Sequence, residues 1–149
     1  MEKLRASIVG ITTKALEHDS WILRKLGAQC FYRFITKSNI SFQETDEVIH
    51  NKLYKTVKGP FWEGKHTACG ALLEFYLSRP AMFNVDGVVM VVTQLSFGSD
   101  QHKKALAQLI ETVLIPKFWH KLSSTQQETY KEKLLKSSFL SESLIVQNL

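Results

Sequence analysis

Cysteine, proline and long apolar runs are scarce in this chain of 149 residues. The longest apolar run, residues 88–92, is far shorter than the roughly 18 residues of a membrane-spanning helix. The first residues carry charges and no apolar core, so we expect no secretory signal. The only two cysteines, Cys30 and Cys69, lie within apolar helical patterns. We therefore predict free, buried thiols in a reducing compartment rather than a disulfide scaffold.

No catalytic signature occurs either. The chain has no G-x-S-x-G, P-loop, H-E-x-x-H or glycine-rich dinucleotide turn. His66 and Cys69 are spaced like two metal ligands on one helix, but no second pair exists to complete a tetrahedral zinc site. We expect a protein that is not an enzyme, with no cofactor, no metal and no small-molecule substrate.

The charge balance is mildly basic. The formal net charge is +5, and no block of five like charges occurs. With 44% hydrophobic and 22% charged residues, the composition is that of an ordinary folded protein. Such basicity suits an acidic protein, a nucleic acid or an anionic membrane, and it does not decide among them.

Three stretches of the chain repeat one another. They align on Arg24, Lys65 and Lys103, at offsets of 41 and 38 residues. Each base is followed by a second basic or imidazole residue, and small and large apolar residues then recur in matching positions. A period near 40 residues with helical apolar spacing is typical of stacked helical hairpins.

The breaks between apolar segments predict four helix pairs within one domain, 1–149, which is either complete or a piece of a longer array. The corresponding repeats are about 1–37, 45–79, 84–116 and 124–148. The expected helices are 1–14 with 19–35, 45–57 with 63–78, 85–95 with 100–115, and 124–136 with 138–147. The segment 86–97 is rich in β-branched residues, so an α+β fold stays open as an alternative.

Two further details can be predicted from the helix patterns. We expect the first two helices to bury apolar stripes at three- and four-residue spacing. The stripes are Leu4, Ile8, Ile11 and Ala15, and then Leu23, Leu26, Cys30 and Phe34. Helix N-caps are expected at Thr45, at Ser99 or Asp100, and at Ser124, where Gln127 has the spacing of a capping box.

The first pair, ASIVGITTKALEHDSWILRKLGAQCFYRF, resembles a HEAT repeat, a member of the armadillo-like helical class. Asp19 and Arg24 match the turn acid and the second-helix base that bond neighbouring HEAT repeats in register. The resemblance implies an all-α, right-handed helical solenoid of three to four HEAT-like helix pairs. Lys65 stands in place of the base in the second repeat, and no acid there matches Asp19.

The second repeat, EVIHNKLYKTVKGPFWEGKHTACGALLEFYL, is similar to a repeat of the large HEAT-repeat proteasome adaptors and scaffolds. Gly59, Trp62, Gly64 and Lys65 match the family's helix–turn–helix motif. Pro60 and His66 depart from it, where the family has Arg and Glu. The resemblance implies a scaffold or adaptor that associates with the proteasome, in the cytoplasm or the nucleus.

The basic residues that open the second helices are the candidate partner-binding site. They are Arg24, Lys25, Lys65, His66, Lys103 and Lys104. Stacked repeats would align them into one stripe that suits an extended acidic protein. A register ladder, or charge that only keeps the protein in solution, explains the same residues. Our main interpretation is a non-enzymatic interaction scaffold; the alternative is a basic helical module that binds nucleic acid or an anionic membrane.

Overall fold

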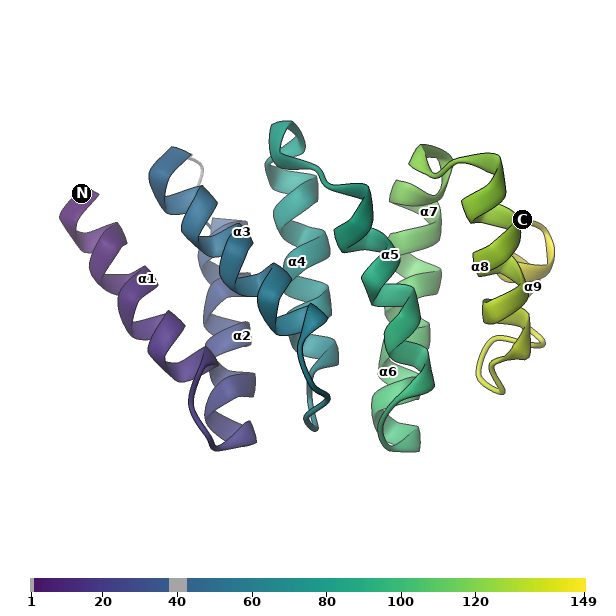
Figure 1. Ribbon diagram of the computed structural model, residues 1–149, viewed down its shortest axis with the longest axis horizontal. Helices are drawn as coiled ribbons and strands as arrows, with labels where there is room; N and C mark the ends of the chain where they lie inside the picture. Colours follow the sequence, from purple (N-terminus) through teal and green to yellow (C-terminus); the bar gives the residue numbers. More distant parts are fainter. Residues whose placement is uncertain (1, 38–42) are drawn as a thin grey trace. The chain divides into compact units, whose positions relative to one another are not determined.

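A computed structural model describes residues 2–37 and 43–149 of the chain. Within these ranges every regular element is a helix and no strand occurs (Figure 1). The prediction of an all-α protein is therefore confirmed. The β-branched segment that left an α+β fold open forms helix α5, Val85–Thr93, and a 3-10 turn at Gln94–Ser96. None of the described helices is long and apolar enough to cross a membrane.

The chain divides into two compact units, Met1–Phe83 and Asn84–Leu149. The first unit contains two helix pairs: α1 (Glu2–Leu16) with α2 (Trp21–Lys37), and α3 (Gln43–Lys58) with α4 (His66–Ser78). Helix α1 packs against α2 and α3, and α4 packs against α2 and α3. Figure 1 shows the resulting two layers of this unit, with α1 and α3 in front of α2 and α4. That both units form one domain stays a prediction.

The core of the first unit is closed by a buried ion pair. Apolar residues of α2, α3 and α4 fill the interior: Phe31, Ile35, Ile49, Leu53, Leu72, Phe75 and Tyr76. Just after α4, Arg79 donates from Nε to Asp46 Oδ1 at 3.1 Å and from Nη1 to the Ile35 carbonyl at 3.2 Å. A buried guanidinium needs such partners, so this contact fixes the ends of α2, α3 and α4 together.

The second unit begins with α5, whose first turn is capped by Asn84. Its other helices are α6 (Asp100–Leu109), α7 (Ile115–Phe118), α8 (Ser124–Lys136) and α9 (Leu144–Gln147). Ser99 caps α6 as predicted, accepting from the His102 N–H at 3.2 Å. The capping box of α8 uses Ser123 and Gln126, one residue before the predicted pair. Thr45 lies inside α3 and is not a cap.

Two predicted helices of this unit are wrong in their extent. The predicted helix 100–115 is interrupted by a π-helical turn at Ile110–Leu114, and α7 continues the chain to Phe118. Pro116 has no N–H to donate and its ring crowds the preceding turn, so a wider turn accommodates it. Of the predicted helix 138–147, only α9 is helical, since the chain turns repeatedly between Ser137 and Ser143.

Candidate functional site

Arg24, in the first turn of α2, is attached to the turn between α3 and α4. Its guanidinium carbon lies 5.3 Å from the centroid of the Trp62 ring, and Nη1 donates to the His18 carbonyl at 3.1 Å. Trp62 itself is buried. A cation over an indole is a favourable contact. Arg24 therefore joins the first helix pair to the turn of the second.

Lys65 is buried at the start of α4 and is only 1% exposed. Its Nζ donates to the Gly59 carbonyl at 2.7 Å, which closes the turn that contains Trp62. Burial lowers the pKa of this ammonium group, and the nearby Cys69 opposes that shift. A partner could reach this charge only if the turn opened, so the predicted binding role of Lys65 gains no support.

Lys25 and His66 lie beside the same turn. A Cβ on Gly64, which has a φ of +87°, would lie 3.1 Å from Lys25 Cδ, so the lysine stem covers this glycine. Burial lowers the pKa of His66, the charge of Lys25 lowers it further, and Glu63 acts in the opposite direction. Both effects that lower the pKa favour the neutral imidazole of His66. The structure brings four of the predicted residues together around one turn, where packing accounts for most of their contacts.

The other two predicted residues, Lys103 and Lys104, lie on α6 in the second unit. Lys104 is exposed, whereas Lys103 is half-buried. Consecutive residues of a helix point about 100° apart, so the two side chains face different surroundings. One continuous stripe through both units stays a prediction.

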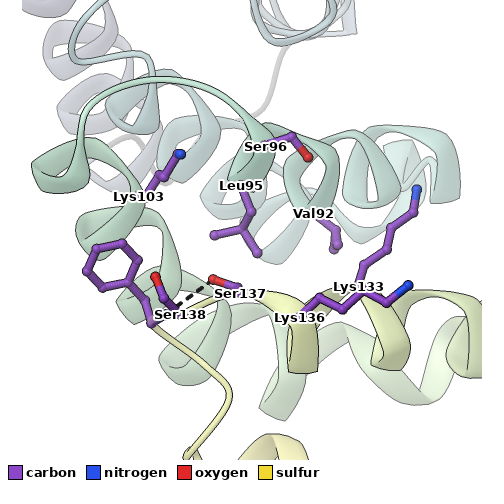
Figure 2. A pocket seen from close by; sticks show the side chains of 9 residues that line it. Val92, Leu95, Ser96, Lys103, Lys133, Lys136, Ser137 and Ser138 are labelled. Atoms are coloured by element: carbon purple, nitrogen blue, oxygen red, sulfur yellow. Dashed lines mark hydrogen bonds between the residues drawn. The ribbon is translucent and has the colours of Figure 1, made fainter.

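Lys103 lines a pocket of about 370 Å³ that sequence reasoning did not find. The other lining residues come from the end of α5, the 3-10 turn after it, the end of α8 and the turn that follows α8: Val92, Leu95, Ser96, Lys133, Lys136, Ser137, Ser138 and Phe139. Figure 2 shows Lys103 on one side of the pocket, Lys133 and Lys136 on the other, and Leu95 and Val92 between them. No carboxylate lines it. The basic last turn of α8 was the available sequence signal.

A second surface, on α1 and α2, is apolar and exposed. The predicted stripes are not buried: Leu4 is 59% exposed and Ile11 71%, and Leu23, Leu26 and Cys30 are exposed as well. The burial prediction for these stripes, including a buried Cys30, is therefore wrong. The two helices instead bury other faces, which carry Val9, Thr12 and Leu16 on α1 and Ala28, Phe31 and Ile35 on α2.

We call the exposed set the α1–α2 apolar face, a name for the exposed surface of this helix pair and not for one side of either helix. It comprises Leu4, Ile8, Ile11, Trp21, Ile22, Leu23, Leu26 and Tyr32. These are eight of the twelve large apolar side chains that are exposed in the described part of the chain. A concentration of this kind in one helix pair marks a surface for binding.

The 41-residue repeat shows what covers the same face in the second pair. Leu23 aligns with Gly64, which Lys25 of α2 covers, and Cys30 aligns with Ala71, which is fully buried. Leu26 aligns with Thr67, which lines a hollow together with residues of α2. The first pair thus packs on this face of α4. On α2, Leu23, Leu26 and Cys30 are exposed and have no such cover within the described residues.

Neither cysteine belongs to a metal centre in the described residues, which contain no group of three or more His, Cys, Asp or Glu side chains able to hold an ion. Cys69 is fully buried as predicted, and burial raises the pKa of its thiol to about 12. Comparison of the chain with protein-family models, with curated proteins and with solved structures finds no match.

Proposed function

We propose that the protein is a non-enzymatic interaction scaffold that binds another protein through the α1–α2 apolar face. The observation that carries this proposal is the exposure of eight large apolar side chains on one helix pair. Trp21 and Tyr32 are among them, and such aromatic residues are enriched where binding energy concentrates. A binding role explains why these residues are apolar although the chain itself leaves them in water.

The proposed occupant is a helical segment of another protein, with an apolar stripe and acidic flanks. Its helical form follows from the repeat, because in the second pair the matching face is covered by α2. We propose acidic flanks because the first helix pair is itself basic. Residues 1–37 contain seven Lys and Arg but three Asp and Glu. A second copy of the chain would bring like charges together, which disfavours self-association.

A HEAT-like solenoid and a proteasome partner belong to the same proposal. The two-layer packing of α1–α4 supports the solenoid. The residues that resemble proteasome scaffolds also have definite places in the turn: Gly64 adopts a positive φ, Trp62 is buried and Lys65 binds the Gly59 carbonyl. That turn is thus a structural motif, and its resemblance supports a proteasome subunit as partner, in the cytoplasm or the nucleus.

The test is affinity purification of the tagged chain from cell lysate, followed by mass spectrometry. We expect proteasome subunits to be enriched over a mock purification and lost with Ile11→Glu. Leu144→Glu is the matched control, because Leu144 is also 71% exposed but lies on α9. Retention by Ile11→Glu would refute the apolar face as the docking site. Recovery of nucleic-acid or membrane proteins instead, lost at high salt, would favour the basic-module alternative.

A further inference from the structure

The pocket of the second unit combines positive charge with an apolar floor. Lys103, Lys133 and Lys136 line it without a carboxylate, and Val92 and Leu95 supply the apolar part. Like charges around a hollow raise the local concentration of anions. Its volume of about 370 Å³ is large enough for one or two side chains of a bound peptide.

The three lysines differ in how strongly each indicates a bound anionic ligand. Lys133 and Lys136 occupy the last turn of α8, where the carbonyl ends of any helix favour cations. Lys133 is also held near the Tyr130 ring, at 5.3 Å from its centroid. Lys103 is more informative, because it lies in the first turn of α6, where a helix terminus disfavours a cation, and yet the residue is half-buried.

The arrangement of the charges favours an extended ligand. Figure 2 shows Lys103 at one side of the pocket and Lys133 and Lys136 at the other, with Leu95 between them. Carboxylates spaced along a peptide could meet the lysines on both sides of the pocket. We propose that this pocket binds an acidic segment of a partner protein, with an apolar side chain on Leu95 and Val92 and a carboxylate toward each side.

This inference rests on the proposed function as a scaffold, and it gives the second unit a contact of its own. The probe is a short synthetic peptide with a central leucine flanked by glutamates, titrated into the isotope-labelled full chain by NMR. We expect saturable shifts at Leu95, Ser96, Lys103 and Phe139. Reversing one contacting charge should weaken binding, so we expect Lys103→Glu to raise Kd about tenfold.

The matched control is Lys104→Glu, which changes the net charge equally but at an exposed neighbour outside the pocket lining. It should change Kd less than about twofold. The proposal would be overturned if both variants lost the same affinity for the peptide. It would also be overturned if a peptide with glutamine in place of every glutamate bound equally well, or if no saturable shift appeared. Lys103-dependent binding to phosphatidylserine vesicles without binding to the peptide would overturn it as well.

The two proposals can fail separately. Ile11→Glu lies in the first unit and should bind the acidic peptide as the unmodified chain does. Failure of peptide binding would leave capture through the α1–α2 apolar face intact. Retention of the proteasome by Ile11→Glu would refute that face and leave the peptide result unchanged.

Discussion

Removal of the Asp46 carboxylate should be among the most damaging single changes in the first unit. The Arg79 and Asp46 side chains are only 5% and 2% exposed, and their Nε–Oδ1 distance is 3.1 Å. In Asp46→Ala the guanidinium stays buried, with the Ile35 carbonyl and the Ser78 hydroxyl as remaining acceptors. Breaking one side of such a pair costs about 3–5 kcal/mol, a large part of the stability of a small domain.

The assay is urea unfolding followed by circular dichroism, and the control is a second ion pair of the same unit. Lys52 and Glu17 lie 2.6 Å apart, but their side chains are 34% and 49% exposed. Glu17→Gln should therefore cost less than about 1 kcal/mol. A double variant, Asp46→Leu with Arg79→Met, should recover much of the loss because no buried charge remains. If Asp46→Ala were no more destabilising than Glu17→Gln, burial would not be what makes this pair important.

Two further predictions concern glycine and cysteine. A Cβ at Gly27 would lie 2.7 Å from the backbone nitrogen of Leu16, so Gly27→Ala should destabilise the protein by about 1–3 kcal/mol in urea unfolding. A Cβ at Gly10 would meet nothing within 4 Å, so Gly10→Ala should stabilise the protein by about 0.5–1 kcal/mol. If the two substitutions changed the free energy of unfolding equally, Gly27 would not mark a close approach to Leu16. Cys30 is exposed and should react rapidly with a thiol reagent, whereas buried Cys69 should react only after unfolding; two fast thiols would contradict this burial.

The helices that could be predicted from the sequence are those whose signals are local. Apolar spacing located both pairs of the first unit, and Ser99 marked the start of α6. The π-helical turn before Pro116 was missed, because a widened turn keeps the same apolar residues on the buried side. In the last pair, the predicted helix 124–136 is confirmed as α8, but most of the predicted helix 138–147 is wrong, because consecutive turns satisfy the backbone groups of residues 137–143.

The functional residues were harder to predict, because exposure depends on contacts between distant segments. The alignment pairs Arg24 with Lys65, but Arg24 lies in the first turn of α2 over Trp62, whereas Lys65 precedes α4 and is buried against the Gly59 carbonyl. Lys133 and Lys136 lie outside the repeated stretches, so the repeat did not predict them as binding residues. They line the same pocket as Lys103 from a different helix, an arrangement that no local sequence pattern encodes.

The wrong burial prediction for α1 is itself informative about function. A periodic apolar stripe shows that some surface covers a helix, but the sequence does not show whether that surface belongs to the same chain. Helix α1 has two stripes, and the one it buries includes the polar Thr12, whose hydroxyl bonds back to the Ile8 carbonyl. The stripe of Leu4, Ile8 and Ile11 is the more apolar, and it faces water. Since packing among the described residues does not account for that stripe, its composition supports the proposed contact with another protein.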